Sequence, residues 1–211
     1  IVDRDRVITS YVAGLPVLPQ QLPQMEGSWN WIRKDNEDLH RQTRLDASDL
    51  LREAFAKGGY VGKGGGKTSS AKFTSIKEML QGTKILAVSK GLPDLPVPKS
   101  GTHFELDHGG SPIDQAVSLQ ASGYKVATVN AASAYHAGGG FTSGGRHALE
   151  EAFCSQSTLH CSLKQVVDQL PHTTGQFHAH IPVDGAILSP SVEILRKGTD
   201  FGYQLLPKPV A

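Results

Sequence analysis

The chain has 211 residues and a mass of 22.6 kDa, which suits one domain with a sizeable core, or one domain with an extra arm. Hydrophobic residues make up 38% and charged residues 19%, a composition that indicates a globular rather than a disordered chain. The net charge of +1 argues against a large nucleic-acid-binding surface, although it leaves room for a small patch that binds a phosphorylated ligand. The sequence has no run of about 18 apolar residues, so we expect no membrane span.

Residues 1–38 are predicted to form an extended arm in front of a domain that covers residues 39–211. The arm contains the proline-rich stretch GLPVLPQQLPQ and has no amphipathic period. Trp29 and Trp31 alternate with polar neighbours, which favours docking of the arm onto the body or onto a protein partner over stacking on nucleic acid. Because the first residue is Ile rather than Met, we interpret the amino terminus as processed, trimmed or unobserved.

Residues 39–60 predict a helix, since Leu51, Ala54 and Phe55 lie on one face and Gly58-Gly59 provide a stop. The stretch VGKGGGKTSS that follows resembles a phosphate-binding P-loop only superficially. That motif would need glycine where Val61 stands, and a strand rather than a helix before it. We therefore predict a mobile surface loop here.

The remaining elements are predicted, in chain order, as strands over 83–89 and 102–108, a helix over 111–123, a strand over 124–130, a long helix over 146–170, and two short strands over 186–196 broken at Pro190. Ser111 is the expected N-cap of the first of these helices, with Pro112 in its first position and Gly123 beyond its end. The order strand, helix, strand, glycine loop, helix, strand is typical of an α/β fold, with helices packed on a largely parallel or mixed sheet.

The two cysteines, Cys154 and Cys161, lie seven residues apart in the predicted long helix, roughly 10 Å along its axis. That separation is too large for an undistorted disulfide. We interpret them as buried thiols, which indicates an intracellular, reducing compartment without saying which one.

A glycine-rich loop carries the first candidate site. Gly138, Gly139 and Gly140 follow the likely end of a strand by eight residues. Glycine lets a ligand approach the backbone, and N–H groups in such a loop can form an anion-binding concavity, so a diphosphate is a plausible occupant. The alternative is a flexible connection without a ligand.

Two adjacent glutamates, Glu150 and Glu151, begin the helix after this loop. Neighbouring helical residues point about 100° apart, so one carboxylate can reach into the loop while the other holds a ligand hydroxyl or the loop backbone. A carboxyl group beside a bound sugar can act as acid and then base in glycoside hydrolysis. The alternative is a pair of solvated glutamates that favour the helix start.

The stretch VATVNAASAYHAGGGFTSGGRHALEEAFCSQSTL resembles the catalytic signature of the microbial-type poly(ADP-ribose) glycohydrolases. Those are macrodomains with a strand ending in Asn, a GGG loop and then Gln-Glu-Glu. The resemblance covers roughly residues 39–200, including the "AILSPSVEILR" segment. It implies a macrodomain-like, three-layer α/β/α fold with a mixed, largely parallel central sheet.

The resemblance also implies a role for each matching residue. Asn130 would hold the ribose whose C1″ is attacked, and residues 138–140 and Phe141 would line the ligand. Glu151 matches the catalytic acid, and Glu150 matches the partner that fixes the ribose of the leaving group. The expected substrate is poly(ADP-ribose) or a protein-linked ADP-ribose, and no metal or cofactor is required.

Two features depart from the family pattern. Leu149 stands where the family has Gln, and the sequence ends at LLPKPVA, where family members continue into another strand. We therefore expect a domain that lacks its C-terminal part. A non-catalytic ADP-ribose-binding module, or a structural subunit of a larger assembly, is the alternative function.

Other side chains suggest weaker hypotheses. His147, Glu151 and Cys154 share a helix face and could form a zinc trio. His178 and His180 could form a metal pair on a strand, although surface or structural histidines are the favoured interpretation. A nucleophilic role for Cys154 is disfavoured because no electropositive setting surrounds it.

Overall fold

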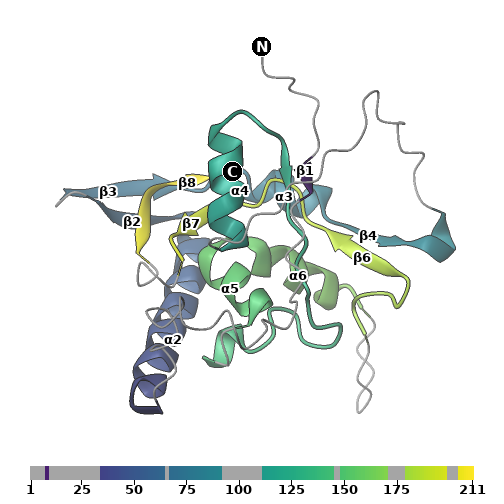
Figure 1. Ribbon diagram of the computed structural model, residues 1–211, viewed down its shortest axis with the longest axis horizontal. Helices are drawn as coiled ribbons and strands as arrows, with labels where there is room; N and C mark the ends of the chain where they lie inside the picture. The colour runs from purple at the N-terminus through teal and green to yellow at the C-terminus, as the bar shows by residue number, and fades with distance from the viewer. Residues whose placement is uncertain are drawn as a thin grey trace, which may run out of the picture.

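The computed structural model describes residues 8–9, 34–64, 67–91, 111–144, 148–170, 179–198 and 204–211. Its elements are β1 (Ile8–Thr9), α2 (Lys34–Lys57), β2 (Gly59–Gly64), β3 (Lys67–Lys72), α3 (Ile76–Gly82), β4 (Lys84–Ala87), η3 (Val88–Lys90), α4 (Pro112–Ala121), β5 (Val126–Ala127), η4 (Phe141–Ser143), α5 (Leu149–Gln156), α6 (Leu159–Asp168), β6 (Gly185–Leu188), β7 (Ile194–Arg196) and β8 (Leu205–Val210). Helices α5 and α6 lie between the β2–β3 hairpin on one side and the β4–β6 pair on the other (Figure 1). Both the arm tryptophans and the predicted strand over 102–108 fall outside the described residues.

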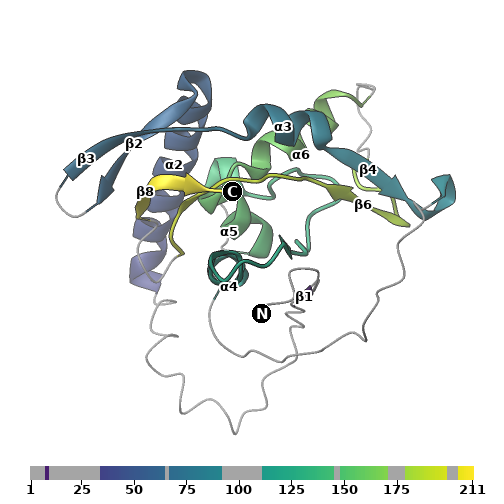
Figure 2. The ribbon, with the colours of Figure 1, turned by 90° about the horizontal axis from the view of Figure 1, so that it is seen from above.

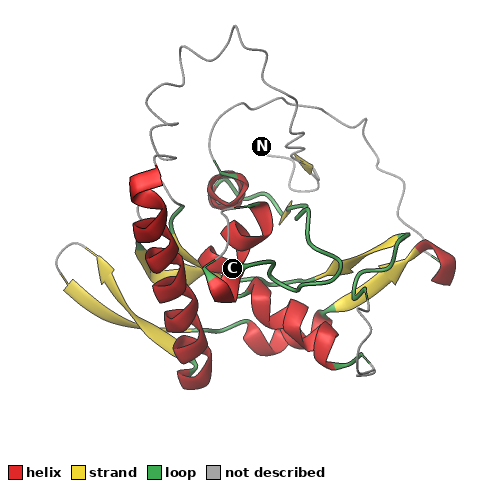
Figure 3. Ribbon diagram, turned by 90° about the horizontal axis from the view of Figure 1, so that it is seen from below, coloured by secondary structure: helices red, strands yellow, loops and turns green. Residues whose placement is uncertain are grey.

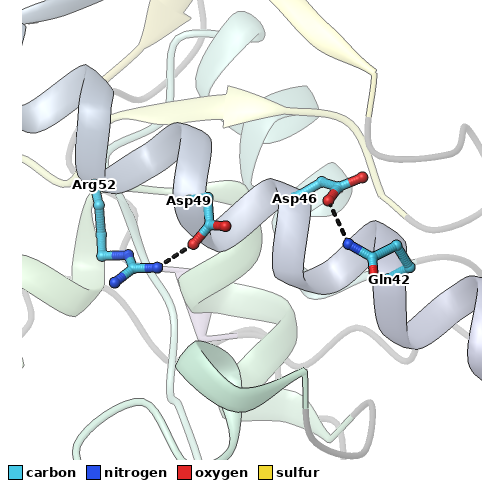
Figure 4. A network of polar contacts seen from close by, with 4 residues as sticks. All are labelled: Gln42, Asp46, Asp49 and Arg52. Carbon is cyan, nitrogen blue, oxygen red and sulfur yellow. Dashed lines mark hydrogen bonds and ion pairs between the residues drawn. The ribbon is translucent and has the colours of Figure 1, made fainter.

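Helix α2 confirms the predicted first helix of the domain. Ala47, Leu51 and Ala54 are spaced four and three residues apart and are all buried, so one stripe of the helix faces the core. Its outer surface carries polar pairs such as Gln42–Asp46 at 2.8 Å and Arg52–Asp49 (Figure 4). Such exposed pairs add little to stability, so the buried stripe holds the helix in place.

The start of α2 corrects one boundary. The helix begins at Lys34 rather than after residue 38, so residues 34–38 belong to it and not to an extended arm. At the other end Gly58 has φ +69°, a left-handed conformation that favours glycine and ends the helix where the sequence indicated.

The stretch predicted as a mobile loop is instead an antiparallel hairpin. β2 pairs with β3 from Gly59↔Lys72 to Gly64↔Lys67. Tyr60 and Ala71, which oppose each other in this register, are both buried in the core. These two side chains anchor the base of the hairpin, a contact that glycine content alone could not indicate.

The described strands form four two-stranded sheets. β1 and β5 are parallel, whereas β2–β3, β4–β6 and β7–β8 are antiparallel. Within the described ranges the pairs do not join into the one largely parallel sheet that we expected, and the three-layer arrangement stays a prediction (Figure 2). The mixed helix and strand content itself is confirmed.

Helix α4 and its cap match the sequence prediction. Ser111 Oγ accepts a hydrogen bond from the Ile113 N–H at 3.2 Å, and Pro112 occupies the first helical position. Gly123 follows the helix with φ +89°. The next strand, β5, covers only Val126–Ala127, so most of the predicted strand over 124–130 is loop (Figure 3).

The predicted long helix over 146–170 is wrong, because α5 and α6 are separate helices. The Thr158 N–H donates to the Glu193 carbonyl oxygen at 2.9 Å, and the Glu193 N–H donates to Thr158 Oγ1 at 2.9 Å. Ser157 also forms a β-bridge with Ile194. This two-way pairing with the β7 segment takes the backbone out of the helix at Ser157 and Thr158.

One hydrophobic core lies under these elements. It joins buried side chains of α2, η4, α5, α6 and β7, among them Leu51, Phe141, Phe153, Leu163 and Leu195. Both cysteines are free, as predicted, but only Cys154 is buried, and Cys161 is half-buried. No helix in the described part of the chain is long and apolar enough to cross a membrane.

Candidate active site

The glycine loop, residues 128–140, runs from the end of β5 to η4 without regular secondary structure. Two internal backbone hydrogen bonds shape its last turn. The Gly139 N–H donates to the His136 carbonyl oxygen at 2.8 Å, and the Phe141 N–H donates to that of Gly138 at 3.0 Å. The loop therefore has a defined conformation before any ligand is considered, which argues against a merely flexible connection.

Gly138 and Gly139 both adopt positive φ, at +82° and +55°. A Cβ on Gly138 would lie 2.6 Å from His160 Cδ2, and one on Gly139 would lie 2.8 Å from Glu151 Cδ. Glycine is thus required at both positions by the backbone conformation and by the protein's own side chains.

Glu150 is bound on both of its carboxylate oxygens. Oε2 accepts a hydrogen bond from the Ser133 N–H at 2.7 Å, and Oε1 accepts one from the Gly138 N–H at 2.8 Å. The residue is 3% exposed, and burial raises the pKa of its carboxyl group against the effect of these two donors. Glu150 therefore ties together two points of the glycine loop that are five residues apart along the chain.

Glu151 makes a different contact from its neighbour. Its Oε1 accepts a hydrogen bond from the Gly140 N–H at 2.7 Å, and the residue is 9% exposed. Among the described residues, no hydrogen bond to its Oε2 is found. One oxygen is thus fixed by the loop while the other remains available.

These contacts decide between the two interpretations of the glutamate pair. Solvated carboxylates would be exposed, but Glu150 and Glu151 are both buried against the loop. The divergence expected for adjacent helical residues is observed, because the two side chains bind different parts of the loop.

Asn130 stands at the entrance of the glycine loop, and its buried Oδ1 has no hydrogen-bond partner in the described part of the chain. It also borders a cavity of about 660 Å³ whose walls are mainly apolar residues of β5, β6 and α4. The glycines at 138–140 and the two glutamates are not among the described lining residues of that cavity. We therefore place the candidate site at the loop and its carboxylates rather than in this apolar cavity, with Asn130 adjoining both.

A comparison with known protein families identifies the family of the chain. Residues 50–197 match the family model described as microbial-type PARG, catalytic domain. The chain belongs to this family. The resemblance based on the Asn, GGG and Glu-Glu order is therefore confirmed.

Solved structures agree with the family assignment. The chain is similar to poly(ADP-ribose) glycohydrolase (PARG) from Thermomonospora curvata, with 26% identity, a TM-score of 0.60, and coverage of 80% of this chain and 61% of that one. The same enzyme bound to the inhibitor ADP-HPD matches with 26% identity and a TM-score of 0.59, over 80% of this chain and 59% of that one. The chain thus spans about three fifths of the length of these PARG structures. No curated protein matches it.

Phe141, which is predicted to line the ligand, is buried beneath the glycine loop. It is 2% exposed and packs against the His160 ring, with the ring centroids 5.1 Å apart. Burial lowers the pKa of His160, with smaller effects from Lys164 and, in the opposite direction, from the Ala137 carbonyl. Phe141 supports the loop from the core side, and contact with a ligand stays a prediction.

The described residues give little support to a metal site or to a cysteine nucleophile. His147 and His178 lie outside the described residues, so the zinc trio and the histidine pair are untested. In the described ranges, no group of three His, Cys, Asp or Glu side chains is placed to hold a metal ion. Burial raises the pKa of the Cys154 thiol well above its usual range, which disfavours a thiolate nucleophile.

Sequence reasoning missed Ser133, whose N–H is an anchor for Glu150, and His160, which packs against Gly138 and Phe141. A serine five residues before the glycines carries no distinctive signal. His160 follows the break between α5 and α6, so helical spacing could not place it beside the loop.

Proposed function

We propose that this protein is an ADP-ribose glycohydrolase that cleaves the ribose–ribose bond of poly(ADP-ribose) or the bond of a protein-linked ADP-ribose. The observation that carries the proposal is the buried Glu151 carboxyl group. One of its oxygens accepts the Gly140 N–H, and the other accepts no hydrogen bond from the residues that the structure describes. Family membership and the similarity to Thermomonospora curvata PARG support it.

In the proposed reaction, Glu151 first acts as an acid. It gives a proton to the leaving ribose oxygen as the C1″–O bond breaks and an oxocarbenium-like centre forms. The resulting carboxylate then takes a proton from water, whose oxygen forms the new bond to C1″. Protons and bonds balance, and Glu151 returns to its starting state.

Asn130 is proposed to hold the reacting ribose, because its buried Oδ1 has no partner and would gain a hydroxyl donor from the sugar. The bare surface of residues 138–140 is proposed to lie against the diphosphate. Phe141 is proposed to complete the ligand-binding set from beneath the loop.

Glu150 is proposed to serve catalysis mainly through the loop. Two backbone N–H groups already occupy its carboxylate, so a ribose hydroxyl would compete with Ser133 and Gly138 for the same oxygens. We also propose that the strands belong to the mixed central sheet of a three-layer α/β/α fold. The arm that precedes α2 is proposed to dock a protein partner.

The test is incubation of purified protein with a labelled, automodified ADP-ribosyl protein. Release of ADP-ribose by the wild type, and its loss in Glu151→Gln, is the expected result. Absence of any release, with no difference between the two proteins, would contradict the proposal.

A second candidate is an ADP-ribose-binding module without turnover, which Leu149 favours. Leu149 is half-buried and packs against the core, so this position supplies no amide near the glutamates. Calorimetry that detects tight ADP-ribose binding by a protein with no hydrolytic activity would support this candidate over the first.

A further inference from the structure

His180 is a buried side chain that the proposed reaction does not use. It lies in the chain between α6 and β6 and is 2% exposed. Among the described residues, neither ring nitrogen has a hydrogen-bond partner. Buried polar atoms in proteins are nearly always paired, so an imidazole with two unpaired nitrogens requires an explanation.

The backbone of His180 is attached to the glycine loop. Its N–H donates to the Ala134 carbonyl oxygen at 2.7 Å. The preceding loop residue, Ser133, gives its N–H to Glu150 at 2.7 Å. Consecutive loop residues are thus held from two elements, by a carboxylate on α5 and by the peptide of His180.

The surroundings of the His180 ring favour its neutral form. Burial lowers the pKa of the imidazole, and His136 lowers it further. The nearby Ala134 carbonyl raises this pKa, although it forms no hydrogen bond with the ring. A proton on this ring would create a buried cation, and no carboxylate of the described residues is among the groups that shift its pKa. A shift of the His180 backbone that brought the ring to water would relieve that cost, and it would also release the Ala134 carbonyl from the His180 N–H.

We propose that His180 is a positioning residue, which holds the glycine loop in its ligand-binding conformation only while its imidazole is uncharged. The relevance of this role to catalysis rests on the proposed function, but the loop's conformation can be measured without a substrate. His180 acts through Ala134 and is not itself assigned to the reacting atoms.

Other titratable groups surround the loop and must be separated from His180. They are His136 on the loop, Glu150 and Glu151 on α5, and His160 on α6. In the described residues, His136 is the titratable group that acts on the pKa of His180. Its side chain is exposed, which makes His136→Asn a matched control.

The experiment is hydrogen exchange of the full chain, followed by mass spectrometry of peptides that cover the glycine loop, at about pH 7.5 and about pH 5.5. An exposed imidazole of ordinary pKa about 6.5 is about tenfold more often charged than neutral at the lower pH. We therefore expect loop protection factors in the wild type to fall by up to about tenfold on acidification. His180→Phe, which cannot be protonated, should abolish most of this fall, while His136→Asn should retain it.

His180→Gln, a polar and uncharged variant, provides the second measurement if His180→Phe does not fold. Equal acid sensitivity of the loop in the wild type and in the folded His180 variants would overturn the proposal, as would a wild-type loop whose protection does not change. Calorimetry with ADP-ribose at both pH values separates the two proposals. Failure to bind at either pH contradicts the proposed function, whereas the exchange result alone decides the role of His180.

Discussion

Glu151 Oε1 accepts a hydrogen bond from the Gly140 N–H at 2.7 Å, so the candidate catalytic carboxyl group is fixed to the loop that it would serve. Glu150, one residue earlier, binds the N–H groups of Ser133 and Gly138. The position of the carboxyl group and the conformation of the loop therefore depend on each other.

Glu151→Gln should separate chemistry from loop structure. The amide oxygen can still accept the Gly140 N–H, but the side chain can no longer exchange a proton. We expect turnover to fall by roughly 10²- to 10⁴-fold while ADP-ribose affinity changes by less than about threefold. Rates of ADP-ribose release measure the change in turnover, and calorimetric titration measures the change in affinity. Glu53→Gln, an exposed change on α2, is the control.

Glu150→Gln should destabilise the protein in a pH-dependent way. A glutamine can present only one oxygen, so its NH₂ would face a backbone N–H of Ser133 or Gly138, at a cost of about 1–3 kcal/mol. Because burial raises the pKa of Glu150 in the folded state, its ionisation reduces stability as the pH rises from 4.5 through the raised value. Chemical denaturation at a series of pH values should find that contribution in the wild type and not in the variant. Parallel stability profiles would refute this assignment.

Gly139→Ala should lower stability and turnover by more than the strain of its positive φ alone would cause. The new Cβ would lie 2.8 Å from Glu151 Cδ, and the residue has φ +55°. Gly123→Ala is the matched control, since Gly123 has φ +89° and nothing within 4 Å of the added atom. We expect the control to lose about 1–2 kcal/mol of stability and Gly139→Ala to lose about 1–3 kcal/mol more, with lowered turnover. Similar losses in both variants would mean that the carboxylate simply moves aside.

Thr158→Val tests the break between α5 and α6. The isosteric change removes the acceptor of the Glu193 N–H at a residue that is fully buried. Leaving that N–H unpaired should cost about 1–3 kcal/mol in urea denaturation. The exposed residue Thr142 offers a control, and Thr142→Val should change stability by less than about 0.5 kcal/mol.

Leu149→Gln restores the residue type that the family pattern has before the glutamate pair. If an amide at this position assists hydrolysis, turnover should rise although stability falls by about 1–3 kcal/mol through lost packing against the core. Parallel assays of ADP-ribose release and thermal unfolding check both effects. Unchanged turnover in a folded variant would exclude position 149 as the limit on activity.

Local signals in the sequence predicted local structure well. The Ser111-Pro112 cap of α4, the glycine that ends α2, and the divergence of Glu150 and Glu151 all follow from residues within one helical turn of each other. The assignment of Glu151 rather than Glu150 to the chemistry comes from family resemblance, not from spacing, and it stays a prediction.

The failures involve partners that are distant along the chain. Thr158 leaves the helix because it pairs with Glu193, 35 residues later. The hydrophobic periodicity within 146–170 cannot indicate that contact. Ser133 and Glu150 meet across 17 residues. The β2–β3 hairpin depends on burial of Tyr60 and Ala71 in the core, which its glycine-rich composition concealed.

The three consecutive loop donors have a consequence for ligand selectivity. The N–H groups of Gly138, Gly139 and Gly140 are all hydrogen-bonded within the protein, to Glu150, to the His136 carbonyl and to Glu151. An incoming phosphate oxygen can therefore bind one of them only by exchange with an acceptor that is already satisfied. A simple anion such as inorganic phosphate gains little from such an exchange, because one acceptor replaces another. A ligand that also placed a ribose at Asn130, as proposed, would have further contacts to offset the displacement. We therefore expect the loop to favour the whole nucleotide sugar over its phosphate alone.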